Sequence, residues 1–136
     1  FVGFGFSEGW AHYAEEMMWE EGLGNKSAEM RIGQLLLALM RDVRFIAAIG
    51  LQTGKMTVAQ AEKMFIEAGF QDAGNARQQA IRGTFDPQYL IYTLGKIMIL
   101  QMREKWFKKY GKNANLKDFH DKILSFGSPP LGLMQQ

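Results

Sequence analysis

The sequence contains no cysteine and only 3 prolines in 136 residues. The lack of cysteine excludes a disulfide scaffold and any metal site built from thiolates. Long apolar runs are also missing, because charged side chains flank the strongest stretch, residues 35–40, and this excludes a membrane-spanning helix. A large excess of one charge is missing too, since the net charge is +2 and 47% of the residues are hydrophobic. Intrinsic disorder is therefore excluded, and we expect a single folded domain over residues 1–136.

The first residues suggest a fragment of a longer protein. The chain begins with Phe1 rather than an initiator methionine, and it runs directly into a segment of phenylalanine and glycine, residues 1–6. These residues do not indicate the cellular location of the protein. A cell-envelope or secreted location would require a signal peptide upstream of them.

Charge is unevenly distributed along the chain. Residues 1–29 carry six acidic residues and one basic residue, so that their net charge is −5 and the remainder of the chain carries +7. The basic residues near the carboxyl end are Arg103, Lys105, Lys108, Lys109, Lys112, Lys117 and Lys122. Solvation and the helix dipole account for basic residues near helix ends, so we expect no nucleic-acid partner.

The spacing of the apolar residues predicts helices throughout. Apolar residues recur every three or four positions rather than alternating, which favours an all-α bundle of about six helices. The expected helices cover residues 7–22, 28–50, 58–69, 72–82, 87–111 and 116–127. Their predicted amino-terminal caps include Ser7, Ser27, Thr57, Asp86 and Asn115. The second helix is apolar nearly all round in its middle, so we expect it to be central and buried.

Three side chains of the first helix are candidates for chemistry. Glu8, His12 and Glu15 are spaced at i, i+4 and i+7 and therefore share one helix face. Neither histidine of the chain belongs to a His-Glu-x-x-His motif, so the chain alone holds no recognisable zinc pair. On spacing alone, acidic residues in a first turn are most often partners of the helix dipole.

Two further groups of residues have alternative interpretations. Tyr92 and Lys96, at i and i+4, would offer a phenol and an ammonium group to a developing oxyanion, but a packed tyrosine at the edge of a core is the commoner case. Arg41 and Arg44 lie on the helix expected to be buried. They would either form ion pairs with acidic residues such as those of the first helix, or face a cavity that receives an anionic substrate group.

Several blocks of sequence together resemble one bacterial family, known as domain of unknown function 885. Its Glu-Gly-Trp-Ala-x-Tyr-x-Glu segment is matched by residues 8–15, EGWAHYAE. Further blocks resemble the carboxy-terminal part of the family in the same order. They are MTVAQA (56–61), RGTFDP (82–87), YTLGK (92–96), DFHD (118–121) and SFGSPP (125–130).

The resemblance implies the carboxy-terminal half of a larger helical zinc metallopeptidase of the gluzincin type. In such a protein, an upstream helix supplies two histidine ligands and a general-base glutamate, and a later helix supplies a third, carboxylate ligand. Glu8 matches that third ligand, and Tyr92 matches a hydrogen-bond donor to the tetrahedral intermediate. By the same resemblance, Glu15 and Arg44 match positions that orient the ligand helix. His12 and Lys96 are further candidates for the surroundings of the metal or the cleft, although the resemblance does not make His12 a ligand.

The same resemblance implies what this piece lacks. The upstream histidines and glutamate are absent from the 136 residues, so the piece alone would hold no zinc and be inactive. Its expected partners are a peptide substrate and the upstream half of the same protein. Exposed apolar surface left by that missing half would favour self-association. The alternative is a helical protein-interaction or structural module without catalysis.

Overall fold

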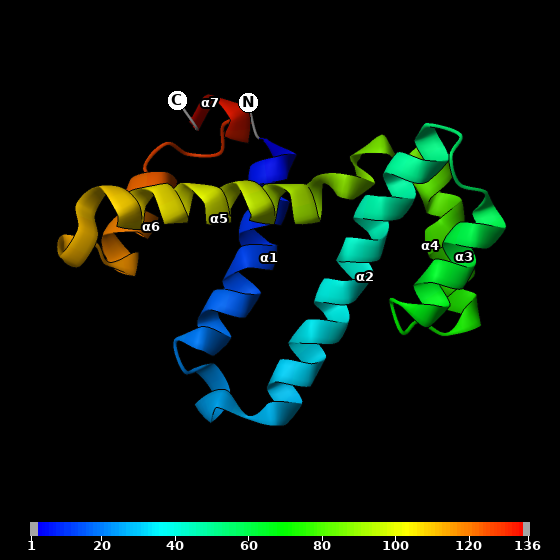
Figure 1. The fold of residues 1–136 in the computed structure, drawn as a ribbon, viewed down its shortest axis with the longest axis horizontal. Helices are drawn as coiled ribbons and strands as arrows, with labels where there is room; N and C mark the ends of the chain where they lie inside the picture. Colours follow the sequence, from blue (N-terminus) through cyan, green and yellow to red (C-terminus); the bar gives the residue numbers. More distant parts are fainter. Residues whose placement is uncertain (1–2, 135–136) are drawn as a thin grey trace.

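The computed structural model describes residues 3–134, and these residues form α-helices and 3₁₀ helices without any strand (Figure 1). The seven α-helices are α1 (Phe4–Glu20), α2 (Ala28–Gln52), α3 (Val58–Glu67), α4 (Ala73–Phe85), α5 (Ile91–Tyr110), α6 (Leu116–Leu124) and α7 (Leu131–Met134). The 3₁₀ helices are η1 (Leu23–Lys26), η2 (Pro87–Leu90) and η3 (Gly111–Asn113). The prediction of an all-α bundle is confirmed.

Local capping signals place most of the helix starts correctly. Ser27 accepts a hydrogen bond from the backbone of Met30 at the start of α2. Thr57 and Gln60 form a reciprocal capping box at α3, and Asn115 caps α6. These side chains satisfy backbone N–H groups that a helix leaves unpaired at its first turn, so the signal is readable within four residues of sequence.

Several boundaries differ from the sequence prediction, since α4 ends at Phe85 rather than at residue 82 and α6 ends at Leu124 rather than at residue 127. Helix α1 begins at Phe4 rather than after Ser7, because the backbone N–H of Gly3 is held by the carbonyl of Ser128, 2.6 Å away. Asp86 caps η2, and the long helix α5 begins only at Ile91. The short helix α7 lies beyond residue 127, where the last of the helices expected from the sequence ends. The start of α1 thus depends on a tertiary contact, and the start of α5 on a change of helix type.

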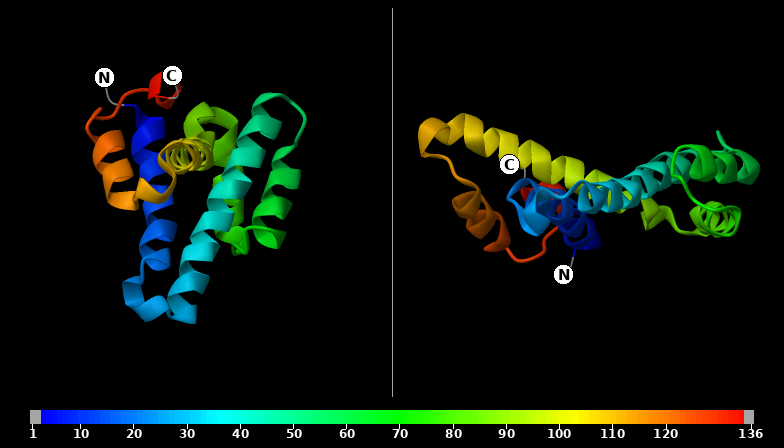
Figure 2. Two further views of the ribbon diagram at one scale, coloured as in Figure 1. Left: turned by 60° about the vertical axis from the view of Figure 1, so that its left-hand side comes forward. Right: turned by 90° about the horizontal axis from the view of Figure 1, so that it is seen from below.

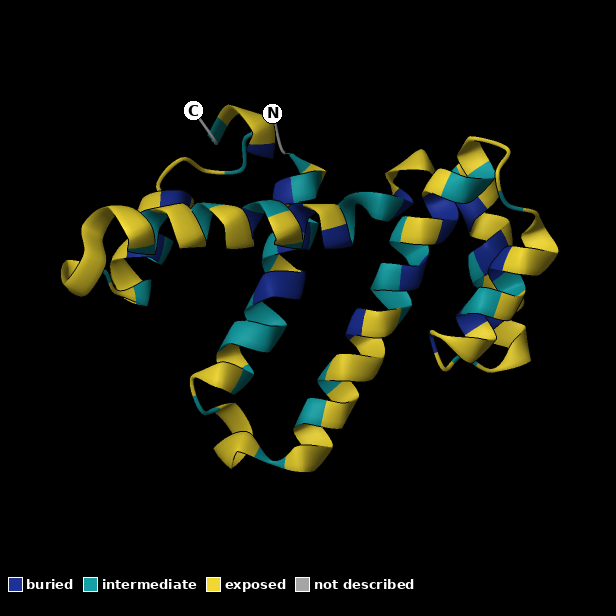
Figure 3. Ribbon diagram, in the orientation of Figure 1, coloured by how far each residue is buried: buried dark blue, intermediate teal, exposed yellow. Residues whose placement is uncertain are grey.

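The buried apolar side chains form two separate clusters (Figure 3). One cluster joins the carboxyl-terminal half of α2 with α3, α4 and η2, and its members are Val43, Ala47, Ala48, Ala61, Phe65, Ala76, Ala80 and Tyr89. The other joins α1, α5, α6 and α7 through Phe6, Tyr13, Ile99, Phe119, Ile123 and Leu131. Figure 2 shows the two groups of helices side by side, connected by α2 and α5.

Helices α1 and α5 cross at glycines. A Cβ atom added to Gly9 would lie 2.5 Å from the Cα of Gly95, and a Cβ atom added to Gly95 would collide with the carbonyl oxygen of Gly5. Side chains at this crossing would push the two backbones apart. The glycines therefore fix where α1 lies along α5, and with it the position of the side chains that α1 presents.

The expectation that α2 is buried is wrong, although α2 is central in that it contacts α1, α3, α4 and α5. Only Ala38, Val43, Ala47 and Ala48 are buried in α2, and its amino-terminal half is largely exposed (Figure 3). The exposed apolar side chains of this helix include Ile32, Leu35, Leu39, Ile46 and Ile49, which we call the α2 stripe. Apolar content on all sides of a helix predicts burial, but the described residues supply too few neighbours to cover it.

Candidate functional site

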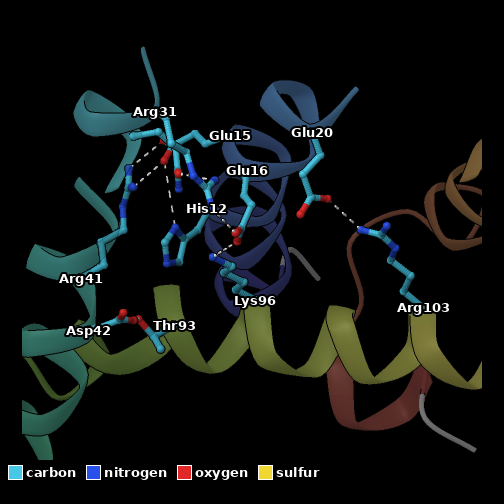
Figure 4. A network of polar contacts seen from close by, with 11 residues as sticks. His12, Glu15, Glu16, Glu20, Arg31, Arg41, Asp42, Thr93, Lys96 and Arg103 are labelled. Atoms are coloured by element: carbon cyan, nitrogen blue, oxygen red, sulfur yellow. Dashed lines mark hydrogen bonds and ion pairs between the residues drawn. The ribbon is translucent and has the colours of Figure 1, made fainter. Parts of the chain in front are cut away.

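The candidate site lies where α1, α2 and α5 meet (Figure 4). We call it the polar seam, and its residues are His12, Glu15, Glu16, Arg31, Arg41 and Lys96. Its firmest contact joins α1 to α2. The guanidinium of Arg41 donates to both carboxylate oxygens of Glu15, at 2.6 and 2.8 Å. Such a two-bonded pair fixes orientation as well as distance. Of the two interpretations of Arg41, the structure shows the ion pair with an acid of the first helix.

Glu16 is the second anchor of the polar seam. One carboxylate oxygen of Glu16 lies 3.1 Å from the guanidinium of Arg31 on α2, and the other lies 2.5 Å from the ammonium of Lys96 on α5. Burial on its own raises the pKa of Glu16, but the hydrogen bonds from Lys96 and Arg31 outweigh it and hold that pKa below its ordinary value. This single carboxylate therefore ties all three helices together.

His12 lies between these ion pairs and is almost completely buried, with 1% of its surface exposed. Its Nδ1 is 4.0 Å from a carboxylate oxygen of Glu15, and neither ring nitrogen has a hydrogen-bond partner among the described residues. Burial, followed by the charges of Lys96 and Arg41, lowers the pKa of His12 to about 4. The imidazole is therefore neutral at pH 7 and does not form a charged pair with Glu15.

Further hydrogen bonds and ring contacts connect α2 to α5, α4 and η2. The hydroxyl of Thr93 donates to a carboxylate oxygen of Asp42, 2.9 Å away. Arg44 donates to the side chain of Gln79, and its guanidinium lies 4.8 Å from the ring centre of Tyr89 and 5.5 Å from that of Tyr92. Arg44 thus forms no ion pair with an acid of the described residues, in contrast to Arg41.

Glu8 differs from the other glutamates of α1. Its side chain is partly buried, yet its carboxylate makes no hydrogen bond or ion pair with any residue that the structure describes. By contrast, Glu15, Glu16 and Glu20 are each held by a cation from a neighbouring helix. Glu8 therefore remains available to a group that comes from outside residues 3–134.

The structure brings together only part of the predicted site. His12, Glu15 and Lys96 belong to the polar seam, whereas Arg44 contacts Gln79 and the rings of Tyr89 and Tyr92 instead. No hydrogen bond or ion pair joins Glu8 or Tyr92 to the polar seam within the described range. Among those residues, no group of three or more potential ligands could hold a metal ion. A complete metal centre would therefore need ligands from elsewhere.

Sequence reasoning missed Glu16, although it connects more helices than any predicted residue. The available signal was weak, because Glu16 lies four positions after His12 and therefore on a related face of α1. Nothing in the sequence says which cation of another helix would face it. The pairing of Asp42 with Thr93 was missed for the same reason.

The comparisons with known proteins agree with the family resemblance. The family described as "Bacterial protein of unknown function (DUF885)" matches residues 1–136. No curated protein matches the chain. A solved structure described as that "of a putative lipoprotein of unknown function from Shewanella oneidensis" is 34% identical and has a TM-score of 0.91. The match covers 100% of this chain and 26% of that one. The chain belongs to the DUF885 family.

Proposed function

We propose that this member of the DUF885 family is the carboxy-terminal helical part of a zinc metallopeptidase, to which it contributes Glu8 as the third protein ligand. The observation that carries the proposal is that Glu8 is partly buried and has no hydrogen-bond or ion-pair partner among the described residues. A carboxylate that is partly buried and has no partner is costly unless a cation or a hydrogen-bond donor meets it. A glutamate oxygen is a suitable ligand for zinc, so the residue fits the role that the family resemblance implies.

The remaining ligands would come from another part of a longer protein. The described residues contain no set of three potential ligands, so Glu8 alone cannot hold a metal ion. The chain also spans only 26% of the solved structure that it matches. Both observations support a divided site in which upstream residues provide two histidines and the general base.

The chain's own residues would then act by positioning and by hydrogen bonding. The glycine crossing with α5 and the Glu15–Arg41 pair restrain α1, and a ligand on a restrained helix keeps its geometry better than one on a loop. A bound zinc ion would polarise the scissile carbonyl and lower the pKa of its water. Tyr92, whose hydroxyl has no partner among the described residues, would donate a hydrogen bond to the oxygen of the tetrahedral intermediate.

The partners follow from the same proposal. The substrate class is a peptide, and the upstream half of the protein would cover the exposed α2 stripe. The described residues include no helix long and apolar enough to cross a membrane. The description of the similar solved structure as that of a lipoprotein is compatible with a cell-envelope location for this chain as well.

The test replaces Glu8 in the full-length protein. We expect Glu8→Gln to lower the zinc content measured by mass spectrometry after dialysis, and to abolish peptide hydrolysis, while the circular dichroism spectrum stays that of the wild type. Glu21→Gln is the matched control, because Glu21 follows the same helix and is exposed. Equal zinc content in wild type and Glu8→Gln would refute the ligand role.

The second candidate is a helical interaction module without catalysis. The exposed α2 stripe favours it, since large exposed apolar surfaces mark contacts between proteins. The upstream sequence separates the two candidates at once. A His-Glu pair followed within two helical turns by another histidine favours the peptidase, and the lack of such a motif in the full-length sequence favours the module.

A further inference from the structure

A cavity of about 340 Å³ lies far from the polar seam, between the carboxyl-terminal half of α5, helix α6 and the end of α7. Its walls are apolar and include Met102, Trp106, Phe119 and Ile123. The volume is within the range of sites that bind small molecules, which begins at roughly 300 Å³. The proposed peptidase function uses none of these residues, so the cavity needs an explanation of its own.

The charged groups around this cavity are all of one sign. Lys105, Lys109 and Lys122 line it, and no aspartate or glutamate does. The three lysines are exposed and form no ion pair with any described residue. Because a lysine packs its alkyl chain on apolar surface and leaves its ammonium in water, these three charges lie at the rim of the cavity.

The cavity wall also contains an unsatisfied donor. The indole Nε1 of Trp106 is buried and has no acceptor among the residues that the structure describes. The cavity therefore combines an apolar interior with hydrogen-bond donors and positive charge, and it lacks acidic groups. An uncharged apolar ligand would make no electrostatic interaction with the ammonium groups of the lysines, and a cationic ligand would be repelled by them.

We propose that this cavity binds a small anionic amphiphile, an unbranched carboxylate whose apolar chain enters between α5 and α6 and whose carboxylate meets the lysines. Two properties of the ligand class follow directly from the lining. The apolar walls select a chain of several methylene groups, since each buried methylene contributes about 0.8 kcal/mol to transfer from water. The lysine rim selects a negative head group over a positive one.

The experiment is a calorimetric titration of the full-length protein with decanoate, below the concentration at which decanoate forms micelles. We expect saturable binding of one decanoate per chain. We expect at least about ten-fold weaker binding of decyltrimethylammonium, which has the same chain and the opposite charge, and no binding of acetate. Vesicles of an anionic phospholipid form a separate arm, and binding to vesicles without binding of decanoate would overturn the proposal.

The variants remove charge without touching the core. The triple substitution Lys105→Gln, Lys109→Gln and Lys122→Gln should weaken decanoate binding by about five-fold or more. Lys108→Gln is the matched control, because Lys108 is exposed on the same helix but does not line the cavity. An unchanged affinity in the triple variant would overturn the proposal, and so would a full-length protein that binds no decanoate because its other parts fill the cavity.

Discussion

His12 makes a prediction that the structure allows us to work through quantitatively. In the folded protein its pKa is about 4, because the ring is buried and lies near Lys96 and Arg41, whereas an unfolded chain has a histidine pKa near 6.5. At a pH between these two pKa values, His12 is protonated in the unfolded state and unprotonated in the folded state. Stability from this group is therefore complete above pH 6.5 and is lost as the pH falls toward 4.

The size of the effect follows from the same two values. Because proton binding is linked to folding, the free energy of unfolding should fall by about 2 kcal/mol between pH 7 and pH 4.5 if the group is fully buried. The side chains of Lys96 and Arg41, whose charges also lower the pKa of His12, are 14% and 15% exposed, so solvent screens part of their effect and about 1 to 2 kcal/mol is the expected range. This loss equals a substantial part of the net stability of a small domain.

The assay compares wild type with His12→Leu by urea unfolding at pH 7 and at pH 4.5. Carboxylates and His120 titrate in both proteins, so their contributions cancel in the difference. We expect His12→Leu to be no less stable at pH 7, because it removes two ring nitrogens that have no partner in the described residues, and to gain about 1 to 2 kcal/mol relative to wild type at pH 4.5. An NMR titration that places the pKa of His12 at or above 6.5 would refute the reasoning.

Three further predictions concern packing, catalysis and association. Gly95→Ala should lower the free energy of unfolding by about 2 kcal/mol or more through backbone collision with α1, whereas Gly33→Ala, with open space around it, should be neutral or stabilising by up to about 1 kcal/mol in the same urea assay. In the full-length protein, Tyr92→Phe should raise the barrier by about 2 to 4 kcal/mol in kcat with little change in KM, and unchanged kcat would remove Tyr92 from the mechanism. The 136-residue chain alone should self-associate in analytical ultracentrifugation, and Leu39→Lys with Ile46→Lys should shift it toward monomer.

The sequence was sufficient for those parts of the fold that depend on neighbouring residues. The capping box at Thr57 and the caps at Ser27 and Asn115 each involve residues three positions apart, so they could be predicted from the sequence. The start of α1 could not, because Gly3 is held by Ser128 from the other end of the chain. Contacts across that separation leave no local signature.

The prediction that α2 is buried was wrong for a different reason. An apolar helix was expected in the centre of the bundle, yet Leu35 and Leu39 are exposed in the described residues. The pattern correctly marks a helix that requires cover on several faces, but it does not say which chain segment provides that cover. For the candidate site, the face shared by Glu8, His12 and Glu15 was predictable from spacing, whereas the cations that hold Glu15 and Glu16 come from other helices.

The polar seam separates two apolar clusters, and this arrangement explains why ion pairs occur there at all. An apolar contact between α1 and α2 would stabilise the fold while leaving the rotation of α1 loosely defined, since apolar packing is not directional. Partly exposed ion pairs such as Glu15–Arg41 add little stability, about 1 kcal/mol at most, but their geometry is directional. Glu8 lies on the same helix face as His12 and Glu15. The seam therefore fixes the direction in which α1 presents Glu8, and the proposed role of Glu8 as a metal ligand in a site completed by another part of the protein would require that restraint.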